Sequence, residues 1–96
     1  MSAYVISEVE VLDEPTFNRY RALAQESILE YGGRYVVRGA LPEAAEGDWP
    51  PQRRLVVVEF PDKDAARRWY SSESYAEALA IRDRALRRRL LFVDGL

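Results

Sequence analysis

The most informative stretch of the sequence is Gly32–Gly39, GGRYVVRG. A glycine pair suits the end of a helix, because glycine adopts the left-handed conformation that lets the backbone turn at once. The residues after the pair alternate in the direction of their side chains, as in any strand. The stretch therefore predicts a helix that ends at Gly32-Gly33, followed by a strand that carries Arg34 and Arg38 on one face.

The segment before the glycine pair predicts a strand and then a helix. Residues Ala3–Val11 alternate between two kinds of side chain, as a half-buried strand does. Asp13 offers an N-cap and Pro15 lies in the first helical turn. The apolar residues that follow have helical spacing: Phe17, Tyr20, Ala24, Ile28 and Tyr31.

The segment after the glycine pair repeats this order. Ala40–Pro51 holds three prolines and several acids, which indicates a loop. Leu55–Phe60 is an apolar run that predicts a central strand, and Asp62 caps a second helix. We expect Ser71-Ser72 to break or kink that helix before its period resumes. Leu90–Val93 is the last predicted strand.

The predicted order is strand, helix, strand, strand, helix, strand. This order is the ferredoxin-like βαββαβ arrangement, an α+β fold with a four-stranded antiparallel sheet and two helices on one face. A chain of 96 residues is long enough for one such domain and too short for two. We therefore predict a single ferredoxin-like domain over residues 1–96.

The two faces of the predicted sheet differ in polarity. The face expected against the helices is nearly free of charge and carries Val5, Val9, Tyr35, Val37, Val56, Val58 and Phe60. The opposite face mixes aliphatic and charged side chains: Tyr4, Ile6, Glu8, Arg34, Val36, Arg38, Leu55, Val57 and Glu59. Such a face suits neither open water nor a dry core, whereas a second copy of the chain would cover it. We therefore predict a homodimer.

Composition excludes several classes of function. The net charge of −2 and the pI of about 5.2 disfavour nucleic acid as a partner. No run of about eighteen apolar residues is present, so we expect no membrane partner and a cytoplasmic location. The absence of cysteine and histidine removes disulfides, thiol nucleophiles, histidine triads and nearly all zinc sites. We expect no cofactor and no metal, and any catalysis would use carboxylates, tyrosine, arginine or backbone groups.

Four blocks of the sequence resemble an uncharacterised bacterial family, catalogued as domain of unknown function 1330. These blocks are Gly32–Gly39, Glu46–Trp49, Arg54–Pro61 and Trp69–Tyr75. The resemblance implies a dimeric α+β barrel, in which two ferredoxin-like subunits join their sheets. It implies no established substrate, cofactor or catalytic residue. Related barrels include cofactor-free monooxygenases and small-molecule isomerases, which is an analogy of fold alone.

A polar cluster on the charged face is the first candidate site. Glu8, Arg34, Arg38 and Glu59, with Tyr4 beside them, would bind an anionic or carbonyl-bearing molecule through the two-pronged arginine donor. The alternative interpretation is a network of ion pairs that sets the register of the dimer. We favour the network, since buried pairs more often specify an interface than catalyse.

Aromatic and basic residues outside this cluster are expected to serve mainly in packing or at the surface. Trp49 lies in the proline-flanked loop, where it would close over a cleft or, more often, pack on a partner subunit. Tyr20, Tyr31, Trp69 and Tyr75 are expected in the core. Five arginines near the end of the second helix are expected to form a solvated helix end: Arg82, Arg84, Arg87, Arg88 and Arg89.

Three functions are consistent with the sequence. The first is binding of a small molecule in a barrel cleft near Tyr4, Arg38 and Glu59. The second is a cofactor-independent enzyme, of isomerase or monooxygenase type, with Glu59 or Glu8 as general base, Arg38 stabilising an enolate or carboxylate, and a tyrosine as proton donor. The third is a structural or interaction module without a ligand.

Overall fold

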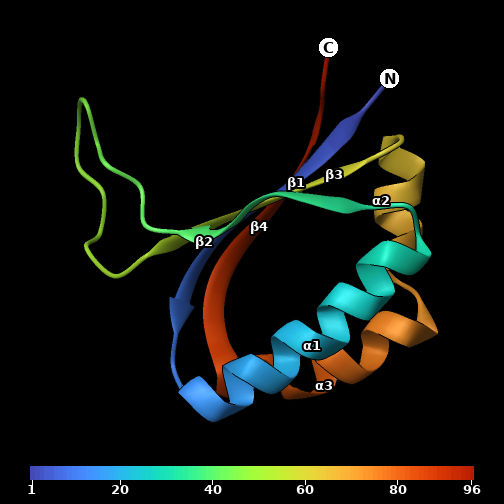
Figure 1. Ribbon diagram of the computed structural model, residues 1–96, viewed down its shortest axis with the longest axis horizontal. Coiled ribbons are helices and arrows are strands. Elements are labelled where there is room, and N and C mark those ends of the chain that lie inside the picture. The colour runs from blue at the N-terminus through green and yellow to red at the C-terminus, as the bar shows by residue number, and fades with distance from the viewer.

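Four antiparallel strands form a curved sheet, and all of the helices lie on one side of it (Figure 1). The structure is a computed structural model that describes residues 1–96. The strands are β1 (Ala3–Val11), β2 (Arg34–Ala40), β3 (Arg54–Phe60) and β4 (Leu86–Asp94), in the spatial order β2-β3-β1-β4. The helices are α1 (Glu14–Glu30), α2 (Lys63–Tyr70) and α3 (Glu73–Ala85). This arrangement confirms the predicted ferredoxin-like α+β fold.

The helices begin where the sequence predicts. The Asp13 carboxylate accepts a hydrogen bond from Thr16 N at 3.1 Å, and the Asp62 carboxylate accepts one from Ala65 N at 2.7 Å. The predicted break at Ser71-Ser72 separates α2 from α3, and Ser72 is the N-cap of α3. There are therefore three helices rather than two, and none of them is long and apolar enough to span a membrane.

The glycine pair ends α1 and allows close packing of β2. Gly32 has a φ of 81°, which other residues adopt only with strain. A Cβ on Gly33 would lie 2.7 Å from Ile28 Cγ2 and 2.8 Å from Phe60 Cε1. The first glycine is therefore needed for the turn, and the second for the approach of the backbone to the core.

Strand β2 contains an irregularity that reverses the direction of its side chains. Tyr35 pairs with Val58, but Val37 pairs with Val57, so β2 has one more residue than β3 between these pairs. An extra residue shifts the alternation by one, which turns the side chains that follow it to the other face, up to a second shift between Arg38 and Ala40. The predicted faces of Val37 and Arg38 were therefore wrong. Val37 lies on the face away from the helices, and Arg38 lies on the helix side, where it hydrogen bonds to the amide oxygen of Gln25 in α1.

Strand β4 is longer than predicted. It begins at Leu86 instead of Leu90, because the nine residues of β1 pair with it from Val11–Leu86 to Ala3–Asp94. Arg82 and Arg84 lie in the last turn of α3 as expected, but Arg87, Arg88 and Arg89 belong to β4. Their prediction as a helix end was wrong, since a continuous ladder of strand hydrogen bonds outweighs the helix propensity of arginine.

The hydrophobic core fills the space between the helices and the sheet. It contains the buried residues Val5, Val9, Phe17, Tyr20, Ala24, Ile28, Val58, Phe60, Ala65, Ala66, Trp69, Tyr75, Ala78, Ala85 and Leu86. Tyr20, Trp69 and Tyr75 are core residues, as predicted, and Tyr31 packs at its edge. The other face of the sheet is covered by no element of the chain.

Candidate functional site

A cavity of about 60 Å³ lies on the helix side of the sheet. Its floor includes Val5, Ser7 and Val9 from β1, and α1 lies over it with Phe17, Tyr20, Ala24 and Ile28. Twelve of its 18 lining residues are hydrophobic. One water molecule occupies at least roughly 10–15 Å³ of a cavity, so this cavity has room for roughly four to six groups of that size. It can therefore hold a small organic molecule or a short segment of a larger one.

Four arginines line this cavity, and no aspartate or glutamate does. They are Arg21 from α1, Arg38 from β2, Arg54 from β3 and Arg88 from β4. The ion pairs of the chain involve other cations, namely Arg34, Arg53, Lys63, Arg67, Arg82 and Arg89. Most of the cavity lining is consequently apolar, and its charged groups are all positive. This combination favours an anionic ligand.

Arg88 is held in a cluster with two buried phenols. Its guanidinium donates to Tyr20 Oη at 2.6 Å and to Tyr75 Oη at 2.8 Å, and the two hydroxyls also contact each other. Burial opposes the charge of Arg88, but the two phenol oxygens outweigh it and raise its pKa. Burial, with the neighbouring Tyr20, raises the pKa of Tyr75 far above its ordinary value. The cluster is therefore a fixed cation flanked by a neutral phenol at Tyr75.

Trp69 forms the end of the cavity nearest to α2. Its indole packs against Tyr75, with ring centroids 4.2 Å apart, and against Phe60 at 5.5 Å. Its Nε1 donates to Ser27 Oγ at 2.9 Å, and Ser27 Oγ in turn donates to Ala24 O at 2.8 Å. The wall is thus rigid, because the one polar group of the indole is satisfied inside the core.

Glu59 lies on the opposite face of the sheet. Its carboxylate pairs with Arg34 at 2.6 Å and accepts a hydrogen bond from Tyr4 Oη at 3.3 Å. Hydrogen bonding to Ser2 first, and to Arg34 and Tyr4 as well, lowers the pKa of Glu59 against the effect of burial. Three of the predicted site residues therefore do meet, but as a satisfied ion pair whose carboxylate is a weak base.

Glu8 forms a second, separate pair on that face. It accepts from Arg89 at 2.9 and 3.0 Å and lies 3.7 Å from Arg53. Tyr4, which faces Glu59, is four residues from Glu8 on β1, or roughly 13 Å along the strand. The predicted cluster is thus divided into two ion-paired groups, and Arg38 belongs to neither.

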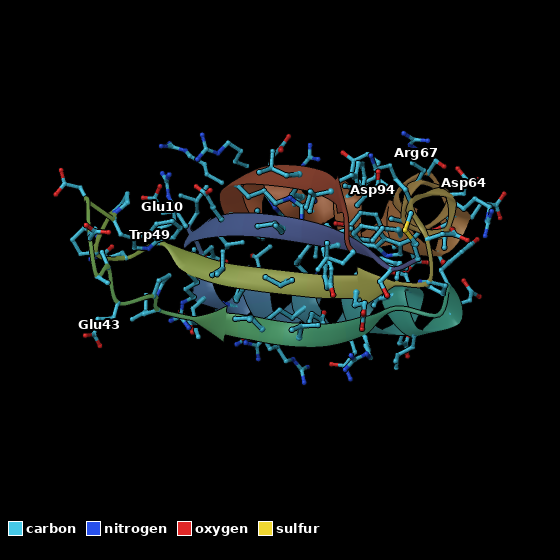
Figure 2. All side chains as sticks on the ribbon, turned by 90° about the horizontal axis from the view of Figure 1, so that it is seen from above. Glu10, Glu43, Trp49, Asp64, Arg67 and Asp94 are labelled. Carbon is cyan, nitrogen blue, oxygen red and sulfur yellow. The ribbon has the colours of Figure 1, made fainter.

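The side chain of Trp49 forms no hydrogen bond with the side chains of these groups. It lies in the loop between β2 and β3, at the end of the sheet far from Asp64 and Arg67 of α2 (Figure 2). Its Nε1 donates to Arg53 O at 2.7 Å, which closes the loop on itself. Its predicted contact with a ligand or a partner subunit stays a prediction.

Sequence analysis missed Arg21, Arg54 and Arg88 as site residues, and Arg88 is the one that contacts the buried phenols. It stands in a run of three arginines that resembles a solvated helix end. The signal that identifies it is strand alternation: Arg87 and Arg89 face away from the helices, and Arg88 between them faces inward. That signal becomes visible only once β4 is known to begin at Leu86.

Comparison with known proteins supports the fold. Residues 2–96 match the family described as Domain of unknown function (DUF1330). No curated protein matches the chain. A protein of unknown function from Rhodopseudomonas palustris is similar in structure, with a TM-score of 0.80 and 17% identity over 99% of this chain and 82% of its own.

An enzyme structure also resembles the chain. SnoaB, a cofactor-independent oxygenase from Streptomyces nogalater, has a TM-score of 0.71 and 14% identity over 99% of this chain and 93% of its own. At this identity the likeness is one of fold.

Proposed function

Since this chain belongs to the DUF1330 family, whose function is unknown, we propose that it binds a small carboxylate with an apolar body in the cavity between the sheet and α1. The observation that carries this proposal is the set of four cavity arginines without a carboxylate partner. The proposal agrees with the sequence-based expectation of an anionic ligand. It differs in the place of the site, which is now on the helix side of the sheet instead of the face away from the helices (the outer face), where acids neutralise the arginines.

The charge of Arg88 supports this proposal most directly. A partly buried guanidinium without a counter-ion costs free energy, because it loses hydration that two neutral phenols replace only in part. A ligand carboxylate would supply the missing charge and accept paired N–H bonds in the plane of the guanidinium. The cation is therefore best explained as half of an ion pair whose other half is the ligand.

The size of the cavity limits the body of the ligand. A cavity of about 150 Å³ accepts benzene, whereas this cavity measures about 60 Å³. An aromatic ring would enter only if the side chains at the opening moved, and exposed Arg21 is one that can. A short aliphatic chain fits the cavity as it stands, so aliphatic acids of roughly four to six carbons are the first candidates.

Isothermal titration calorimetry tests the proposal. Butanoate and pentanoate are expected to bind, and butanamide and pentanamide, which have the same shapes without the charge, are expected to bind at least tenfold more weakly. Affinity for the acids should fall with added salt. Equal binding of an acid and its amide, or no binding of either, would reject the proposal.

We also propose that the outer face of the sheet is the interface of a homodimer. An apolar stripe crosses all four strands there, from Val37 through Val57 and Ile6 to Leu91. In the single chain Leu91 of this stripe is 45% exposed, and Val36 and Val93 are 50% and 42% exposed. An apolar stripe between two rows of paired charges suits a second copy of the same face.

Light scattering coupled to gel filtration tests the dimer. The wild type is expected at twice the mass of one chain, and Leu91→Glu is expected at the mass of one chain, because it places a charge in the stripe. Leu29→Glu is the matched control, since Leu29 is 61% exposed on α1, on the helix side. A wild type with the mass of one chain at micromolar concentration would reject the dimer.

A cofactor-independent oxygenase is the second candidate function. The likeness to SnoaB favours it, and Arg88 would stabilise the anion of a substrate that itself supplies the electrons to dioxygen. Glu8 and Glu59, the predicted general bases, lie on the other face and would take no part. An oxygen electrode decides the matter: uptake that depends on a bound acid and disappears in Arg88→Met supports the enzyme, and no uptake leaves binding alone.

A further inference from the structure

Ser7 places an unpaired hydroxyl in the centre of the cavity floor. It is the middle residue of β1, which is flanked by Val56 of β3 and Leu90 of β4. Its side chain lies on the helix side between Val5 and Val9, and the residue is only 4% exposed. Its Oγ is the one buried side-chain polar atom of the chain without a hydrogen-bond partner.

The other buried serines show that this is unusual. Ser27 Oγ bonds to Ala24 O and to the Trp69 indole. Ser72 Oγ bonds to Trp69 O and caps α3 through Tyr75 N. A buried hydroxyl without a partner is unfavourable, and native proteins rarely retain one without a use. Val or Ala would fill this site in the sheet as well, as Val5 and Val9 do on either side.

The arginines surround this hydroxyl. Arg54 and Arg88 both pair in register with Val9, two residues from Ser7, on the same face of the sheet. Arg38 pairs with Val56, which pairs with Ser7. Two residues of a strand span roughly 7 Å. A ligand whose carboxylate meets an arginine can therefore bring an oxygen a few bonds further along its chain to Ser7.

We propose that Ser7 determines specificity by hydrogen bonding to a hydroxyl or carbonyl oxygen of the ligand. The ligand class is then hydroxy- or oxo-carboxylates of short chain length, in preference to unsubstituted alkanoates. Ser7 suits either oxygen, because a serine hydroxyl both donates and accepts. This inference rests on the proposed binding of a carboxylate in the same cavity.

Matched pairs of acids test it by calorimetry: butanoate with 3-hydroxybutanoate, and pentanoate with 4-oxopentanoate. The wild type is expected to bind the oxygenated member of at least one pair about tenfold more tightly. Ser7→Ala is expected to remove that preference and to leave the affinity for butanoate and pentanoate within about twofold. Ser74→Ala, in which the lost hydroxyl is exposed and bonds to Glu30, is the control and should change neither affinity.

Thermal unfolding separates a ligand contact from a structural one. Ser7→Ala removes an unpaired buried hydroxyl, so the free protein is expected to melt at or above the temperature of the wild type. A variant that melts well below it would show that Ser7 stabilises the fold, which overturns the inference.

The binding results distinguish the two proposals. If the wild type binds plain and oxygenated acids equally, or if Ser7→Ala weakens both members of a pair equally, the role of Ser7 is refuted and carboxylate binding stands. If no acid binds the wild type, the proposed function fails, and the role of Ser7 fails with it.

Discussion

Replacing Arg88 with methionine should separate ligand binding from stability. Methionine keeps a long apolar side chain but removes the guanidinium, which donates to Tyr20 at 2.6 Å and to Tyr75 at 2.8 Å. Hydrogen bonds from a charged donor contribute about 1.5–3 kcal/mol each, so the gross loss is about 3–6 kcal/mol. In the opposite direction, the variant no longer pays the desolvation cost of burying a cation without a carboxylate partner, and this stabilises the folded state by several kcal/mol.

These two effects nearly cancel in the free protein. The Tyr20 and Tyr75 hydroxyls also keep their contact with each other. We therefore expect Arg88→Met to change the free energy of unfolding by less than about 1.5 kcal/mol in either direction. The affinity of the same variant for butanoate should fall by roughly 10- to 150-fold in Kd, since one charge-assisted hydrogen bond contributes about 1.5–3 kcal/mol.

Urea unfolding followed by circular dichroism measures the first quantity, and calorimetry with butanoate measures the second. Arg87→Met is the matched control: Arg87 is the preceding residue of β4, is exposed on the outer face, and forms no ion pair. It should leave both quantities unchanged. A loss of 3 kcal/mol or more in Arg88→Met with unchanged affinity for butanoate would refute the reasoning, because Arg88 would then be a structural residue.

Three further outcomes follow from the geometry. Gly33→Ala should lower the free energy of unfolding by about 1–3 kcal/mol, because its Cβ would overlap Ile28 and Phe60; an unchanged urea midpoint would contradict this packing. Ser72→Ala should cost about 0.5–2 kcal/mol by removing the N-cap of α3, again measured in urea, and a loss below 0.3 kcal/mol would argue against the cap. The free energy of unfolding should fall as the pH drops below about 4.5, the ordinary pKa of a glutamate, because the pKa of Glu59 is lower in the folded chain and protonation therefore favours the unfolded chain. Glu59→Gln should make this fall shallower, and a pH profile identical to that of the wild type would exclude Glu59 as its source.

Local features of the sequence were sufficient for most of the fold. The N-caps at Asp13 and Asp62 and the break at Ser71-Ser72 depend on side chains that bond to backbone groups within a few residues. Glycine at the end of α1 is equally local, because φ is a property of one residue. Such signals act over short distances, so they are visible without knowledge of the tertiary structure.

The candidate site was harder to predict because it depends on strand register. Sequence analysis assumed an unbroken alternation along β2, and so placed Arg38 beside Arg34 on the outer face. It also ended the second helix too late, and so placed Arg88 in solvent. The first error is a shift in the pairing of β2 with β3, where one extra residue moves a side chain to the other face of the sheet. The second is the missed pairing of β1 with the first residues of β4.

The order and type of the elements thus follow from the amino-acid sequence alone, because caps, turns and hydrophobic periods are short-range effects. Which arginines face the cavity and which lie on the face away from the helices was decided only by tertiary structure. The extra residue in β2 and the full length of β4 are set by pairing with β3 and β1. The physical reason is that hydrogen bonds between strands, rather than local propensity, determine the face on which a side chain lies.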